Sequence, residues 1–171
     1  MARKLIVVAA LALLGSSATF AAATAADPWA AAQKRLVYPI DEPTRTLGYK
    51  VSSFGYQTCP GGRSRSSIFA TYGSYKGVLN GKARGFGIFE GSPAICSDHA
   101  EFTPQGTRMI GGAKATLGVY CDPAKRCSLA QGVANGYILL WRRGKTRIQM
   151  DSAHITLAQF LNVAYNLKPV A

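Results

Sequence analysis

Short runs of β-type residues, separated by glycine-rich turns, fill the chain from residue 49 to residue 152 and restrict its fold more than any other feature. Apolar and polar residues alternate within 67–75 and within 146–152, which is the period of a half-buried strand. We expect strands within the segments 49–59, 67–75, 85–93, 107–121, 135–143 and 146–152. The last two are joined through Gly144 and Lys145, a spacing typical of a tight hairpin. The sequence therefore predicts an antiparallel sheet.

The segment after these runs follows a helical period instead. Its apolar residues at that spacing are Leu157, Phe160, Leu161, Ala164 and Leu167. Thr156 is a suitable N-cap, and Pro169 is expected to end the helix. We expect an α+β fold in which a curved antiparallel sheet of about five to seven strands is packed by this C-terminal amphipathic helix.

Residues 26–47 have the composition of an N-terminal arm rather than of a core. Asp27 and Pro28 are suited to the N-cap and to the first position of a short helix. Two further prolines favour an extended path after it. We expect Trp29 and Tyr38 to dock this arm onto the rest of the protein.

Residues 1–25 match a secretory signal peptide. A short basic pair precedes an apolar stretch over residues 5–14, and residues 23–25 fit the A-x-A rule for cleavage. The apolar stretch is shorter than the roughly 20 residues that a membrane-spanning helix needs. We therefore expect cleavage near Ala25, a secreted or periplasmic protein, and a single α+β domain over residues 48–171.

The chain is strongly basic, with a net charge of +12. Without residues 1–25 it keeps 18 basic residues against eight acidic ones, a charge of +10. Such a balance favours contact with polyanions, among them envelope polymers and lipid headgroups. No recognised nucleic-acid-binding signature accompanies it.

Many of the basic residues lie in the expected turns. These are Arg63, Arg65, Lys76, Lys82, Arg84, Arg142, Arg143, Lys145 and Arg147. Turns at one end of the sheet would form a positive rim near Tyr72, Tyr75 and Trp141, where aromatic rings could add stacking. The candidate anion-binding residues are Arg142, Arg143, Lys145, Arg147, Arg63 and Arg65. The simpler interpretation is a set of solvated turns without a ligand.

Four cysteines, Cys59, Cys96, Cys121 and Cys127, remain after residue 25. An even number in an exported protein indicates two disulfides, and three pairings are available. An Asp-Pro turn between Cys121 and Cys127 favours that pair, which leaves Cys59 with Cys96. The alternative is zinc held by Cys96, His99, Cys121 and Cys127, but these spacings are loose for a zinc site.

Catalytic sets are scarce. Cys96 or a serine would need activation by His99 or His154, and there is no G-x-S-x-G motif. Glu90 and Asp151 could face each other across the sheet as a glycosidase pair. A phosphate loop at 77–82 would be one residue short and would lack the serine or threonine that binds magnesium. We therefore predict no catalytic residues, no metal site and no cofactor, and expect that the protein is not an enzyme.

Several segments together resemble a known family. They are "SIFATYGS", "GFGIFEGSP", "IGGAKATLG", "NGYILLWRRGKTRIQM" and "LAQFLNVAYNL", spread over residues 67–168. This pattern is similar to an uncharacterised bacterial extracytoplasmic domain family, which occurs as the outer module of anti-sigma-factor-like and other cell-envelope proteins. The resemblance implies binding or sensing at the envelope and supplies no catalytic residues. The four cysteines and the lack of a membrane-spanning segment depart from that family's signalling members.

The sequence thus favours a secreted, non-catalytic binding module that contacts an anionic envelope polymer or lipid headgroups through the basic hairpin at 142–147. A module that binds an envelope protein, or acts as a sensor, is the first alternative. A small secreted hydrolase is the second.

Overall fold

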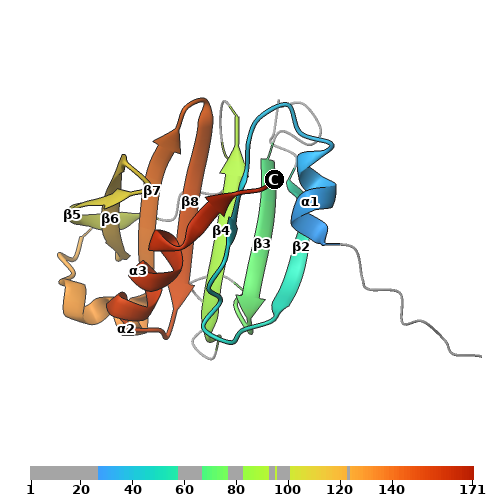
Figure 1. The fold of residues 1–171 in the computed structure, drawn as a ribbon. Coiled ribbons are helices and arrows are strands. Elements are labelled where there is room, and N and C mark those ends of the chain that lie inside the picture. Colours follow the sequence, from blue (N-terminus) through green and yellow to red (C-terminus); the bar gives the residue numbers. More distant parts are fainter. Residues whose placement is uncertain (1–26, 58–66, 77–82, 93–94, 96–100, 123) are drawn as a thin grey trace, which may run out of the picture.

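A computed structural model describes residues 27–57, 67–76, 83–92, 95, 101–122 and 124–171. The protein is mostly antiparallel sheet with a few short helices (Figure 1). Its strands are β1 Asp41–Pro43, β2 Val51–Gln57, β3 Ser67–Gly73, β4 Gly85–Gly91, β5 Phe102–Ile110, β6 Ala113–Tyr120, β7 Tyr137–Arg143, β8 Thr146–Ala153 and β9 Leu167–Pro169. Its helices are α1 Pro28–Gln33, the 3-10 helix η1 Leu129–Gln131, α2 Gly132–Asn135 and α3 Leu157–Tyr165.

Seven strands form one sheet in the order β2-β3-β4-β8-β7-β6-β5, and every neighbouring pair is antiparallel. The chain builds one half through β2, β3 and β4, crosses to the far edge, and returns through β5, β6 and β7 to β8. The two halves meet where β4 pairs with β8, so residues far apart in the sequence lie side by side at the centre of the sheet. The expected antiparallel sheet is confirmed.

The segment 107–121, which we expected to be a single strand, is instead part of a hairpin. Gly111 and Gly112 have φ angles of 54° and 82°, in the left-handed region that favours glycine, and they connect β5 to β6. β5 also begins earlier, at Phe102. This turn raises the number of strands in the main sheet to seven.

The two faces of the sheet differ, because successive side chains of a strand point to opposite sides. One face, here the covered face, carries Ile88, Leu139 and Met150, which neighbour one another in the register and are buried in the main core. The same core includes Trp29 and Tyr38 from the N-terminal segment, both buried. The other face carries the cross-strand pairs Leu140 with Gln149 and Arg142 with Arg147. We call it the basic face because of the two arginines.

The last helix is shorter than expected. Thr156 caps α3 as expected, through a bond from the Gln159 backbone N–H to its hydroxyl at 3.2 Å. The helix ends at Tyr165, however, and Leu167 begins β9 instead of extending the helix to Pro169. The reason is that β9 pairs with β1, so its backbone groups bond to the N-terminal segment.

α3 contributes Phe160, Val163 and Ala164 to the core cluster on the covered face. The ring of Phe160 stacks on that of Tyr137, with centroids 6.0 Å apart. In Figure 1 the N-terminal segment, α3 and β9 run across the same side of the sheet.

Candidate functional site

The β7–β8 hairpin positions the candidate site. Its turn is Gly144 and Lys145, and Gly144 has a φ of 57°, as the first position of a tight two-residue turn requires. The register sets Arg142 opposite Arg147 and Arg143 opposite Thr146. Residues opposite each other share a face, so Arg142 and Arg147 lie on the basic face and Arg143 lies on the covered face.

A hollow of about 370 Å³ opens on the basic face beside this hairpin. We call it the basic hollow; the lining residues that matter here are Ile95, Lys114, Leu140, Arg142, Arg147 and Gln149. Lys114 reaches it from the neighbouring strand, because Thr116 pairs with Leu140 and Lys114 lies two residues before Thr116. The hollow thus combines three cations with an apolar wall.

The three cations of the basic hollow have no acidic partner within the described ranges, where the recorded ion pair is that of Arg143 with Asp41. Arg142, Arg147 and Lys114 are all exposed. Like charges directly opposite each other in a sheet are destabilising by about 0.2–1 kcal/mol. This arrangement therefore concentrates positive charge and lowers the free energy of unfolding.

A buried hydrogen-bond network lies next to the basic hollow. The Gln149 side-chain amide donates to both carboxyl oxygens of Asp151, at 3.2 and 3.0 Å. The Tyr120 hydroxyl donates to one of these oxygens at 2.7 Å, and the Tyr75 hydroxyl to the other at 3.4 Å. Burial raises the pKa of Asp151 to about 6, although the hydrogen bonds from Tyr120, Gln149 and Tyr75 oppose that shift. These three donors hold the carboxyl group in place, and it forms no ion pair with Arg142 or Arg147.

A second buried acidic site lies on the covered face, beneath the N-terminal segment. The backbone N–H of Asp41 donates to both carboxyl oxygens of Glu90 at 3.0 Å, and the Asp41 side chain pairs with Arg143. Thr146 donates to the backbone oxygen of Pro39 at 2.8 Å. Burial, followed by the neighbouring Asp41 charge, raises the pKa of Glu90 well above its ordinary value. Burial also raises the pKa of Asp41, against the opposing effect of Arg143.

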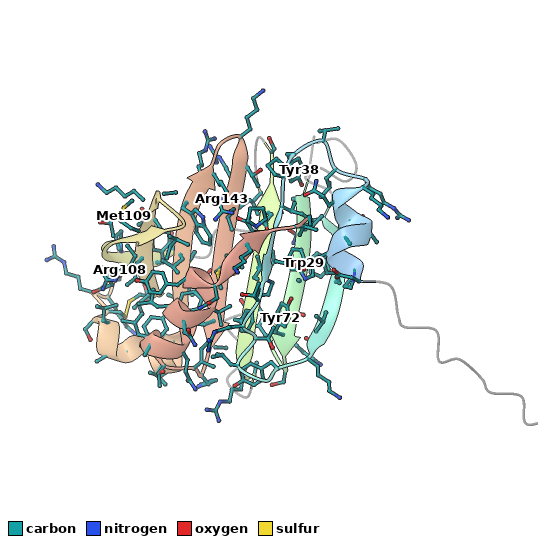
Figure 2. The ribbon with its side chains drawn as sticks, viewed as in Figure 1. Trp29, Tyr38, Tyr72, Arg108, Met109 and Arg143 are labelled. Carbon is teal, nitrogen blue, oxygen red and sulfur yellow. A yellow bond between two sulfur atoms is a disulfide. The ribbon has the colours of Figure 1, made fainter. Side chains whose placement is uncertain are left out.

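The guanidinium of Arg143 fits against the β5–β6 turn. A Cβ atom at Gly111 would meet the end of this side chain and displace it, while the φ of 54° itself favours glycine. Figure 2 shows Arg143 between the hairpin tips and the segment that contains Tyr38. Arg143 is thus already engaged by the protein itself.

The structure brings together only part of the predicted anion-binding set. Arg142 and Arg147 line the basic hollow, and Lys145 is exposed in the turn beside it. Arg143 contacts Asp41 on the opposite face, so it does not join them. Arg63 and Arg65 lie outside the described residues.

Two of the three aromatic side chains expected near a positive rim are placed elsewhere. The Tyr72 hydroxyl accepts a bond from the Trp29 indole at 3.1 Å within the core, and Tyr75 bonds to Asp151. Trp141 belongs to the core cluster, yet it is also among the residues that line the basic hollow, and its indole N–H has no hydrogen-bond partner among the described residues. Tyr72 and Tyr75 are therefore engaged away from the rim, whereas Trp141 lies at the basic hollow.

The expected cysteine pair is present: a disulfide joins Cys121 and Cys127, with Cα atoms 6.0 Å apart. Cys59, Cys96 and His99 lie outside the described residues, as does the whole glycine-rich segment 77–82. Within the part of the chain that the structure describes, no group of three or more histidine, cysteine, aspartate or glutamate side chains could hold a metal ion.

The suggestion that Glu90 and Asp151 face each other is wrong. Glu90 pairs with Ile148 and Asp151 with Gly87, and these two pairs are three positions apart in the register. Glu90 therefore points into the covered face, and Asp151 points to the basic face. The sheet itself separates the two carboxyl groups, which excludes their joint action on one glycosidic bond.

Two polar residues of the basic hollow were missed by the sequence interpretation. Gln149 occupies a polar position in the alternation of β8, so its place on the same face as Arg147 could have been predicted from the period of two. Lys114 gave no such signal, because its place beside Arg142 depends on the β6–β7 register.

Comparison of the chain with protein-family models, curated proteins and solved structures gives no match. None of the helices in the described ranges has the length and apolar character needed to cross a membrane.

Proposed function

We propose that the protein is a non-catalytic binding module that contacts an anionic polymer or surface through the basic hollow. The observation that carries the proposal is the cross-strand pair Arg142 and Arg147 beside Lys114, which forms no ion pair with an acid of the described residues. Arginine is well suited to bind carboxylate or phosphate oxygens through two parallel hydrogen bonds. An anion that bridges the three cations would remove the repulsion that the empty site carries.

The proposed location is outside the cytoplasm, at the bacterial envelope or beyond it. The Cys121–Cys127 disulfide supports an oxidising compartment. The pattern of residues 1–25 and the family resemblance over residues 67–168 point the same way. Wall polymers and lipid headgroups in that compartment carry phosphate and carboxylate groups.

A module that binds an envelope protein is supported less well. Large exposed apolar side chains among the described residues are Val37, Val51, Met109, Val133 and Tyr165. They belong to the turn after α1, and to β2, β5, α2 and α3. Apolar side chains scattered over separate elements are ordinary for a soluble surface, whereas a docking site needs a contiguous patch.

The test is binding of labelled inorganic polyphosphate, followed by fluorescence anisotropy. We expect the affinity to fall as salt is added, because the contact depends on charge. The double variant Arg142→Gln and Arg147→Gln should bind about tenfold more weakly or worse.

The matched control is Lys125→Gln with Arg126→Gln, which removes the same charge from exposed positions. That pair follows the far end of β6, about 20 Å along the strand from Lys114. Equal loss in both double variants would mean that only net charge matters, and would reject the basic hollow as the site.

A further inference from the structure

The basic hollow has an apolar wall, which a purely charged contact does not need. Leu140 and Ile95, both half-buried, line it. The hydrocarbon parts of Lys114 and the two arginines add further apolar surface. An inorganic anion or a bare polymer backbone would leave this wall in contact with water.

The size of the basic hollow is also informative. Its volume of about 370 Å³ lies near the lower end of the range for small-molecule sites, roughly 300–1,000 Å³. Such a volume holds one small molecule, or one side group or chain end of a polymer whose remainder stays outside.

We propose that the basic hollow binds an amphipathic anion: a carboxylate or phosphate head that carries a short alkyl or aryl chain. The head would lie between Arg142, Arg147 and Lys114, and the chain would lie against Leu140 and Ile95. This inference rests on the proposed function and specifies its ligand class. Asp151 does not compete for the cations, since its oxygens are occupied by Tyr120, Tyr75 and Gln149.

Two kinds of ligand belong to this class: a free amphipathic anion in solution, and a lipid that is part of a membrane. Both present the same head and the same kind of chain to the protein. The proposal concerns this shared chemistry, and the experiment contains one arm for each source.

The experiment measures binding of methyl, butyl and octyl phosphate by isothermal titration calorimetry, each below the concentration at which it forms micelles. Burying one methylene contributes about 0.8 kcal/mol, which corresponds to about a fourfold gain in affinity for full burial. For a partly open hollow we expect about a two- to fourfold gain per methylene, ending once the apolar wall is covered.

Two variants remove the apolar wall without changing charge. Leu140→Thr introduces a β-branched residue, which strands favour, and Ile95→Ser alters another part of the wall, which provides a second test should the first variant fold poorly. Either should flatten the chain-length series, because it should weaken octyl phosphate binding much more than methyl phosphate binding. Val51→Thr, an exposed apolar site on β2 at the opposite edge of the sheet, is the matched control and should change nothing.

The lipid arm uses sedimentation with vesicles of phosphatidylglycerol and phosphatidylcholine. Vesicle binding that Leu140→Thr weakens would place the acyl chain of a lipid in the hollow. No vesicle binding together with a rising alkyl phosphate series would support a free anion.

The two proposals fail in different ways. A flat alkyl phosphate series together with polyphosphate binding that depends on Arg142 and Arg147 would overturn the amphipathic ligand and leave the proposed function standing. Absence of binding to every alkyl phosphate and to polyphosphate would overturn both.

Discussion

Arg142 and Arg143 are neighbours in the sequence, yet they meet opposite surroundings. Arg143 lies on the covered face, where the buried carboxyl group of Asp41 pairs with it and its side chain is 26% exposed. Arg142 lies on the basic face opposite Arg147, exposed and with no acidic partner among the residues that the structure describes. One cation stabilises the fold and the other remains available to a ligand. Adjacent basic residues of one strand therefore point to opposite faces of the sheet, where they meet different surroundings.

The largest contrast should appear in the packing of the two faces. Phe160 is fully buried on the covered face, whereas Phe89 is partly exposed on the basic face and stacks on Phe69. We expect Phe160→Ala to lower the free energy of unfolding by about 3–5 kcal/mol. Phe89→Ala should cost less than half as much, since less apolar surface is lost from the interior. Urea denaturation measures both, and equal losses would mean that the core is not concentrated on the covered face.

The next contrast concerns the two arginines. Arg143→Ala leaves the buried carboxyl group of Asp41 without its cation, and we expect the free energy of unfolding to fall by about 2–3 kcal/mol. Arg142→Ala removes an exposed charge and should change it by no more than about 0.5 kcal/mol. The same denaturation measurement applies, with Lys145→Ala in the turn as control. If Arg143→Ala were as mild as Arg142→Ala, its pair with Asp41 would contribute nothing to stability.

The buried carboxyl groups predict a dependence on pH. The pKa of Glu90 is raised well above its ordinary value, and that of Asp151 is raised to about 6, both chiefly by burial. A raised pKa means that the stabilising contribution is complete below the unfolded-state pKa, near 4, and is lost as pH rises through the folded-state value. We expect unfolding to become easier as pH rises from about 4 to 7, by about 2–3 kcal/mol for the Asp151 part.

The variant Glu90→Gln separates the contribution of Glu90, on the covered face, from that of Asp151, on the basic face, to this pH dependence. The amide can still accept the bond from the Asp41 backbone N–H but cannot ionise. The variant should therefore gain stability relative to the natural chain as pH rises, and Glu101→Gln, at an exposed position, should not. A constant difference between Glu90→Gln and the natural chain across this range would show that Glu90 keeps the same charge throughout.

The smallest effect concerns the repulsion between the paired arginines. Arg147→Thr places a good strand former opposite Arg142, and we expect the free energy of unfolding to rise by about 0.2–0.5 kcal/mol at low salt. The gain should shrink as salt is added, because exposed charges are screened. A loss of stability at low salt would show that Arg147 makes a favourable contact instead.

Local patterns predicted the parts of the fold that local interactions determine. Period-two alternation gave the strands, and the Gly144-Lys145 spacing gave the hairpin. Asp27 and Thr156 cap α1 and α3 as expected. The end of α3 was not predicted, because it depends on the pairing of β9 with β1, which joins the two ends of the described chain.

The candidate site was predictable only in part, for the same reason. The basic hairpin could be seen in the sequence, and its alternation could have assigned Arg142 and Arg143 to different faces. Lys114 could not be included, since it comes from a strand whose place in the sheet is set by pairing at a distance. The burial of Glu90 against the N-terminal segment depends likewise on contacts between residues 49 positions apart.

The central claim is that Arg142 and Arg147 bind an anion together, and the salt dependence of polyphosphate binding tests it most directly. Each cation that contacts a polyanion adds about one unit to the slope of log affinity against log salt concentration. The account predicts that Arg142→Gln with Arg147→Gln reduces this slope by about two, whereas Lys125→Gln with Arg126→Gln leaves it unchanged. A slope that is unchanged in the first pair, or reduced equally in both, would contradict it.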